Sequence, residues 1–159
     1  MIHNNRTTAF TGTARTMPPV TQALPANCAM KIEFLTNYDS SNPKDCIFRI
    51  YDFNSEEVKK LVVIFREVAE GVTPEIDLGH QNFICPIGGV TLELRLGSID
   101  EGIFQISDND FLCTLSKSGW ENAIDLAQPF VESENINGYQ WLYDLNSNIE
   151  FLLSRNGKW

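Results

Sequence analysis

Hydrophobic residues recur three and four positions apart between residues 54 and 71, which is the spacing of a buried helical stripe. The members of this stripe are Val58, Leu61, Val62, Phe65, Val68 and Ala69. Asn54 or Ser55 suits the N-cap, and Gly71 suits the position just past the helix end. The pattern therefore predicts an amphipathic helix that packs on a sheet.

Elsewhere the hydrophobic residues alternate with polar ones, as they do in strands with one buried face. The alternation is cleanest at 90–96, and two strands joined by a turn predict a hairpin over 31–53. Further strands are predicted at 102–107, 110–116, 138–144 and 147–154, with one or two short ones over 73–89. Because one face of such strands meets water, the pattern favours antiparallel pairing.

A second helix is predicted at the stretch 116–130. Ser118 and Glu121 have the spacing of a capping box, and Pro129 is expected to end or bend the helix. The elements together predict an α+β fold, with a mainly antiparallel sheet of about six or seven strands and two helices packed on one face. Each helix follows a strand and a polar cap, but no repeat at the level of residues supports two equivalent units.

The first 29 residues differ from the rest of the 159-residue chain. They contain Arg6 and Arg15 but no acidic residue, and they lack a sustained period. Residues 1–29 are therefore interpreted as a polar, acid-free arm or extension. A partner-binding arm, an upstream extension before a start at Met30, and an organelle-targeting peptide all fit this composition. Residues 30–159 are expected to form a single α+β domain.

The charge balance narrows the function classes. Asp and Glu number 21 against 12 Lys and Arg, which gives a formal net charge of −9. Such a chain repels phosphate backbones, so nucleic acid is not an expected partner. The longest apolar run, at 61–65, is far shorter than the roughly 18 residues that span a membrane. The acidity serves solubility or attracts a basic partner protein.

The four cysteines, Cys28, Cys46, Cys85 and Cys113, include no C-x-x-C pair. Three of them lie in apolar stretches, where small buried thiols are common. We therefore expect reduced, buried cysteines and a cytoplasmic protein, because a disulfide framework would suit a shorter, secreted chain.

No catalytic or metal-binding arrangement is evident in the sequence. His80 lies five residues before Cys85, but a turn separates them and no third group is apparent. Zinc ligands at paired spacings do not occur. Asp108 and Asp110 supply only the first step of a calcium loop and are better explained as turn residues. We expect no cofactor, no metal and no enzymatic activity.

The aromatic residues near the C-terminus could either pack in the core or form a contact surface. Tyr139, Trp141 and Tyr143 alternate along one predicted strand, so they are expected to share a face that completes the core. Trp159 follows an Asn-Gly turn signal at the chain end, so it must fold back onto the body or point at something else.

These observations predict a non-catalytic, acidic protein-binding module, such as an inhibitor or immunity-type protein that covers a basic surface of its partner. Asp100, Glu101, Asp108 and Asp110 are the predicted steering charges, and Trp159 is the predicted anchor. Two alternatives stay open, a small carboxylate-based enzyme and a structural or assembly subunit that uses its N-terminal arm. Self-association into a homo-oligomer is also left open.

Overall fold

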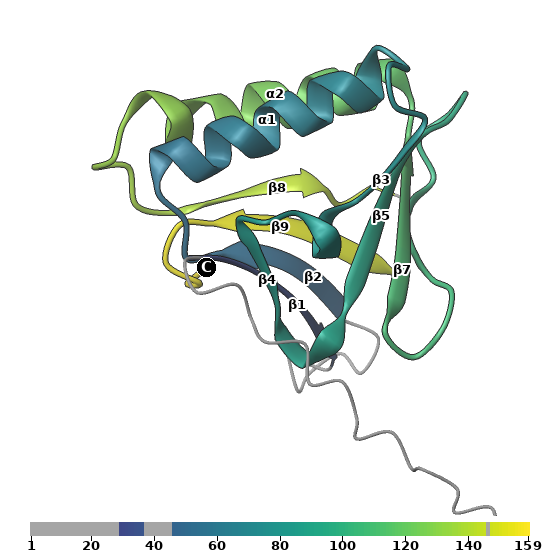
Figure 1. Cartoon of the computed structure of the whole chain (residues 1–159), viewed down its shortest axis with the longest axis horizontal. Coiled ribbons are helices and arrows are strands. Elements are labelled where there is room, and N and C mark those ends of the chain that lie inside the picture. Colours follow the sequence, from purple (N-terminus) through teal and green to yellow (C-terminus); the bar gives the residue numbers. More distant parts are fainter. Residues whose placement is uncertain (1–28, 37–45, 146) are drawn as a thin grey trace, which may run out of the picture.

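The computed structural model describes residues 29–36, 46–145 and 147–159. Over these ranges the chain forms two α-helices and nine strands, which are arranged in two sheets (Figure 1). The predicted α+β class is confirmed. The prediction of one mainly antiparallel sheet is only partly right, because four of the seven strand pairs are antiparallel and three are parallel.

The first sheet, sheet A, has the strand order β4-β1-β2-β9-β8. Its strands are β1 (Met30–Thr36), β2 (Cys46–Tyr51), β4 (Ile84–Pro86), β8 (Tyr139–Tyr143) and β9 (Ile149–Ser154). Pairs β1–β2 and β8–β9 are antiparallel, whereas β1–β4 and β2–β9 are parallel. Strands β2 and β9, which are neighbours in this sheet, are therefore about one hundred residues apart in the chain.

The second sheet, sheet B, has the strand order β3-β5-β7-β6. Its strands are β3 (Glu75–Asp77), β5 (Thr91–Leu96), β6 (Gly102–Gln105) and β7 (Asp110–Leu115). The outer pairs β3–β5 and β6–β7 are antiparallel, and the central pair β5–β7 is parallel. Sheet B thus repeats the pairing pattern of sheet A without β4.

Helix α1 (Ser55–Ala69) confirms the predicted stripe, all of whose members are buried. Asn54 is the N-cap, and a capping box forms with Glu57, whose backbone N–H donates to the Asn54 side chain over 2.9 Å. The Glu57 carboxylate also accepts from the backbone N–H of Met30 at 3.4 Å. This buried acid therefore joins the start of the helix to the start of β1.

Helix α2 (Lys117–Glu132) has Ser116 as its N-cap, and the Ser116 hydroxyl accepts from the backbone N–H of Gly119 over 3.1 Å. The predicted capping box of Ser118 and Glu121 is therefore wrong. The reason is that β7 ends at Leu115, so the helix begins within two residues of the strand.

Pro129 lies inside α2 and does not end it, since the helix continues to Glu132. The last turn is held from outside by the guanidinium of Arg155. Its Nη2 donates to the carbonyl oxygens of Phe130 at 2.7 Å and Ser133 at 2.9 Å. These bonds satisfy carbonyls that a helix end would otherwise leave without a partner.

The two helices lie side by side over sheet A, with sheet B along one flank (Figure 1). Phe65 of α1 packs on Trp120 of α2 with 5.3 Å between ring centroids, and on Phe151 of β9 at 6.4 Å. The indole N–H of Trp120 donates to the carbonyl of Arg95 in β5 over 3.1 Å. The core therefore contains residues from both helices and both sheets.

The connectivity repeats after the middle of the chain. One unit consists of strands β1 and β2, helix α1, and strands β3 and β5. The other consists of strands β6 and β7, helix α2, and strands β8 and β9. In each unit the first antiparallel pair lies in one sheet and the second pair in the other, so the units exchange strands. The sequence shows no repeat, but the structure contains two topologically equivalent units.

The two units differ in one connection. Between β3 and β5, residues 78–90 contain the 3-10 turns η1 (Leu78–His80) and η2 (Ile87–Gly89) as well as β4, which pairs with β1. The equivalent connection between β8 and β9, residues 144–148, is much shorter and contains no strand over its described residues. The edge of β1 is therefore covered by the chain itself, whereas the equivalent edge of β6 is not covered in the same way.

Cys46 and Cys113 carry free thiols, whereas Cys85 is disulfide-bonded. The expectation of reduced cysteines is therefore wrong for Cys85. An apolar neighbourhood indicates burial, and a half-cystine is as readily buried as a thiol. Cys28 and the rest of residues 1–28 lie outside the described residues. No helix of the described ranges is long and apolar enough to cross a membrane.

Candidate functional site

Four of the five predicted contact residues flank the edge strand β6. Asp100 and Glu101 precede the strand, whereas Asp108 and Asp110 lie at and after the turn that leads into β7. Four strand residues at about 3.3 Å each separate the two groups by roughly 13 Å. The structure therefore places these acids near the two ends of β6.

Two of these acids are engaged in local structure. Oδ1 of Asp100 accepts 2.7 Å hydrogen bonds from both the backbone N–H and the hydroxyl of Ser116, at the start of α2. The Asp110 carboxylate accepts from the hydroxyls of Ser107 and Thr91, and these bonds lower the pKa of Asp110 below its ordinary value. Both carboxylates therefore shape the turns that flank β6.

Glu101 and Asp108 are the acids that remain available to a partner. Both side chains are exposed, and within the described residues neither carboxylate forms a hydrogen bond or an ion pair. The backbone of Asp108 does take part in the turn, because its carbonyl accepts from the side-chain amide of Gln105 over 3.2 Å. The two free negative charges thus lie at opposite ends of β6.

Exposed hydrophobic side chains lie on β6 and next to both of its ends. Phe104 in the middle of β6 is 49% exposed, and Ile99 and Ile106 on either side of the strand are exposed further. An exposed apolar patch with a charged rim is typical of protein interfaces. The sequence pattern does not reveal this patch, because alternation alone does not show that β6 is an edge strand.

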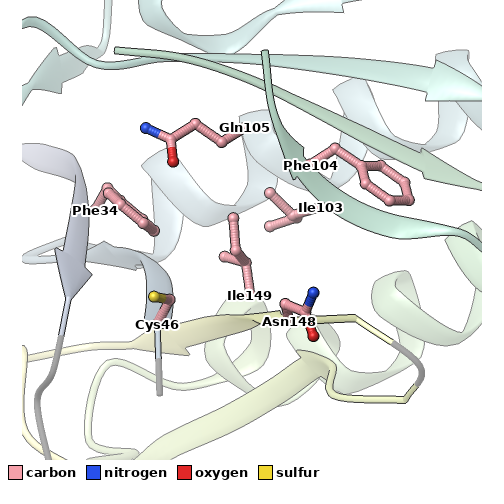
Figure 2. A pocket seen from close by; sticks show the side chains of 7 residues that line it. All are labelled: Phe34, Cys46, Ile103, Phe104, Gln105, Asn148 and Ile149. Carbon is pink, nitrogen blue, oxygen red and sulfur yellow. The ribbon is translucent and has the colours of Figure 1, made fainter. Parts of the chain in front are cut away.

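A cavity of about 460 Å³ lies beside the patch, where β6 approaches the ends of sheet A (Figure 2). The described residues that line it are Phe34, Cys46, Ile103, Phe104, Gln105, Asn148 and Ile149. Ile103 and Ile149 lie at its centre, Cys46 lies at one side, and the ring of Phe104 points away at the rim. This volume is within the range of small-ligand pockets, about 300 to 1,000 Å³.

The chemistry of this cavity is apolar with neutral polar groups. The side-chain amides of Gln105 and Asn148 supply hydrogen-bond donors and acceptors, and none of the described lining residues is an acid, a base or a histidine. The arrangement suits the recognition of an uncharged apolar group and supplies no general acid–base pair of side chains.

Trp159, the fifth predicted contact residue, lies apart from the acids. The chain end folds back over the outer face of sheet A, where Nη1 of Arg49 donates to the carbonyl of Gly157 over 3.0 Å. The Arg49 guanidinium lies 4.1 Å from the ring centroid of Tyr51 and 5.3 Å from that of Trp159. The structure therefore does not bring Trp159 together with the β6 acids.

The aromatic residues of β8 do not share one face. A register shift between Trp141 and Tyr143 pairs Trp141 with Leu152 but Tyr143 with Phe151, so the two side chains point to opposite sides. Tyr143 is buried in the core, whereas Tyr139 is exposed and contacts Trp141 edge to face at 5.9 Å. The predicted common face is wrong because a bulge, which the sequence pattern does not reveal, reverses the alternation.

Over the described ranges, no cluster of three or more His, Cys, Asp or Glu residues is placed to hold a metal ion. His80 instead forms a 2.7 Å contact with the Asp77 carboxylate on the surface. No protein-family model matches the chain, and a search among curated proteins found no match. The site therefore has to be interpreted from its own chemistry.

Proposed function

We propose that this protein is a non-catalytic binding module that contacts a basic surface of a partner protein through β6 and the turns that flank it. An inhibitor or immunity-type protein works in this way. The observation that carries the proposal is the exposed ring of Phe104 between the unpartnered carboxylates of Glu101 and Asp108. Buried aromatic anchors supply much of the binding energy at interfaces, and rim charges mainly speed encounter.

The overall charge supports the same proposal. The net charge of −9 extends an attractive field towards a basic protein, and the same field opposes approach to nucleic acid. Trp159 is 42% exposed on the outer face of sheet A, and it is proposed as part of a separate contact.

The carboxylate-based enzyme and the assembly subunit that uses residues 1–29 remain predictions. Homo-oligomerisation remains a prediction as well. No particular contact or cavity among the described residues favours any of them over partner binding.

The compartment of the protein bears on which partner it meets. The cytoplasmic prediction depended in part on reduced cysteines, and the disulfide at Cys85 removes that support, because disulfides persist mainly in oxidising compartments. Alkylation of intact cells before lysis distinguishes a reducing compartment from an oxidising one. Modified Cys85 indicates a reducing compartment, and protected Cys85 indicates an oxidising one.

Partner capture with matched variants tests the proposal. We would immobilise the full chain and its Phe104→Glu variant, and recover bound proteins from native extract at low and high salt. Val63→Glu is the control, because Val63 is 45% exposed on α1 and lies outside the site. We expect a basic protein that binds the wild type and the control, weakens with salt and is lost with Phe104→Glu.

The affinity is then measured with the purified partner. The double charge reversal Glu101→Lys with Asp108→Lys is expected to slow association more than it speeds dissociation. A complex that is unaffected by both Phe104→Glu and the charge reversal would show that the partner binds elsewhere, and the proposal would then be wrong.

A further inference from the structure

The topological equivalence of the two units makes the edge of β6 comparable with the edge of β1. Both are the first strands of their units, and each pairs on its inner side with the second strand. The outer edge of β1 pairs in parallel with β4, so that Met30 lies opposite Ile84 and Ile32 lies opposite Pro86. The chain itself therefore shows how a strand is accommodated at this type of edge.

The segment that covers β1 contains the short strand β4 and is apolar. Its buried hydrophobic side chains are those of Leu78, Phe83, Ile84, Cys85 and Val90. In the second unit, the described residues of the short connection between β8 and β9 contact the edge of β6 through Ser147. Its hydroxyl oxygen lies 3.3 Å from the backbone nitrogen of Ile103, from which it accepts, and 3.2 Å from the Ile103 carbonyl oxygen.

Beyond Ile103, no strand of the described residues pairs with the outer edge of β6. In an antiparallel pair, alternate residues direct their backbone N–H and C=O groups away from the partner strand. Ile103 does so towards Ser147, so Gln105 directs its backbone groups to the same side. Among the described residues, these groups of Gln105 have no backbone or side-chain partner. The cavity begins at the same place, because Ile103 and Gln105 both line it.

We propose that this cavity and the open edge of β6 together bind an extended segment of the partner protein, which adds to sheet B as β4 adds to sheet A. Apolar side chains of the segment enter the cavity that Ile103 and Ile149 line. This inference rests on the proposed function and names the chemistry of the partner.

The negative charges beside β6 indicate which residues flank the apolar part of that segment. Glu101 and Asp108 lie at the two ends of β6, and neither carboxylate has a partner within the described residues. A bound segment that carries Lys or Arg on each side of its apolar residues would pair with both. Addition of a strand to an exposed edge combines main-chain hydrogen bonds with pockets for alternate side chains.

The probe is a library of random peptides of about nine residues, displayed on phage and selected on the full chain. The enriched peptides are then synthesised and their affinities measured. Gln105→Pro removes the outward N–H at an edge position where proline is tolerated. Gln105→Ala keeps that N–H and removes only the side-chain amide, so the comparison of the two variants separates the contribution of the backbone from that of the side chain. Circular dichroism and thermal melting verify that each variant is folded.

The free thiol of Cys46 provides an independent readout, because Cys46 lines the cavity (Figure 2). Its alkylation by N-ethylmaleimide is followed by mass spectrometry of the labelled fragment. A second blocking variant, Asn148→Trp, fills the cavity from its mouth, and Leu145→Trp is the control on an exposed residue that does not line it. These measurements test the proposal even if Gln105→Pro does not fold.

We expect enriched peptides with apolar residues between Lys or Arg, and slower labelling of Cys46 when they are bound. Gln105→Pro should weaken binding at least about tenfold and clearly more than Gln105→Ala does, whereas Asn148→Trp should weaken it at least about tenfold and Leu145→Trp less than about twofold. Peptides or a captured partner that depend on Phe104 but ignore both blocking variants and leave Cys46 reactive would overturn this inference and leave the proposed function standing. A small neutral molecule retained in the cavity by native mass spectrometry would also overturn it.

Discussion

Oδ1 of Asp100 accepts hydrogen bonds from both the backbone N–H and the hydroxyl of Ser116, each at 2.7 Å. Ser116 is the N-cap of α2, so a carboxylate from the turn before β6 holds the start of a helix. A negative charge is favourable there, because the helix dipole is positive at its N-terminus. Asp100 was predicted from the sequence as a partner contact, and its hydrogen bonds indicate a structural role.

Replacement of Asp100 by alanine should therefore destabilise the fold. We expect a loss of about 1 to 2 kcal/mol in the free energy of unfolding, because the N-cap loses its support. Urea denaturation measures this loss. Asp108→Ala is the control, with an expected change within about 0.5 kcal/mol for an exposed carboxylate without a partner. Equal stability of the two variants would contradict the structural role of Asp100.

Gly119 should not tolerate a side chain, even though alanine normally stabilises a helix by about 1 kcal/mol over glycine. A Cβ at Gly119 would lie 2.3 Å from Oδ1 of Asp100 and 3.0 Å from Cβ of Leu115. We expect Gly119→Ala to lower the free energy of unfolding by about 1 to 3 kcal/mol.

A double-mutant cycle with Asp100→Ala tests whether the clash with Asp100 causes the loss of stability in Gly119→Ala. In that background the clash with Oδ1 is absent, so Gly119→Ala should cost clearly less than in the wild type. A Gly119→Ala variant that is as stable as the wild type would rule out the close approach of the two residues.

Arg155 should be among the most sensitive positions outside the hydrophobic core. Its nearly buried guanidinium lies 5.6 Å from the ring centroids of both Phe53 and Phe130, and it donates to carbonyl oxygens at the end of α2. Arg155→Met keeps much of the apolar stem and removes the donors, so we expect a loss of about 2 to 4 kcal/mol. Arg66→Met on the exposed side of α1 serves as the control in the same thermal and urea experiments, and a comparable loss there would contradict this account.

Glu134 should contribute to the acid sensitivity of the fold. Its carboxylate accepts from the backbone N–H of Ser55 at 2.8 Å and pairs with Arg155 at 2.7 Å, and these contacts lower the pKa of Glu134. A lowered pKa in the folded state means that the stabilisation is present above the ordinary glutamate pKa and is lost as pH falls through the folded value.

The measurement compares wild type with Glu134→Gln by urea denaturation at about pH 7 and about pH 3. We expect the variant to be less stable at the higher pH, and the difference to shrink at the lower pH as the wild-type carboxyl becomes protonated. High salt should also reduce the difference, because the Glu134 side chain is largely exposed. A difference that stays constant with pH would show that the charge of Glu134 is not the cause.

Local features of the fold could be predicted from the sequence. Helix α1 follows from the spacing of its apolar residues and from Asn54, and β5 follows from its alternation. The acids that flank β6 could be located as well, since they lie in turns between apolar strands. The exposed ring of Phe104 and the cavity could not, because both depend on which strand forms an edge.

The sequence by itself thus determined the positions of the helices and most strands, the acidic charge and the acids beside β6, because periodicity, caps and turns are properties of neighbouring residues. Only the tertiary structure decided that there are two mixed sheets, that Asp100 supports α2, and that β6 has an open edge. Alternation shows which side of a strand is buried, but not its partner or direction. Cys46 of β2 lies opposite Ile149 of β9, about one hundred positions away, and such a pairing is selected by the packing of the whole core.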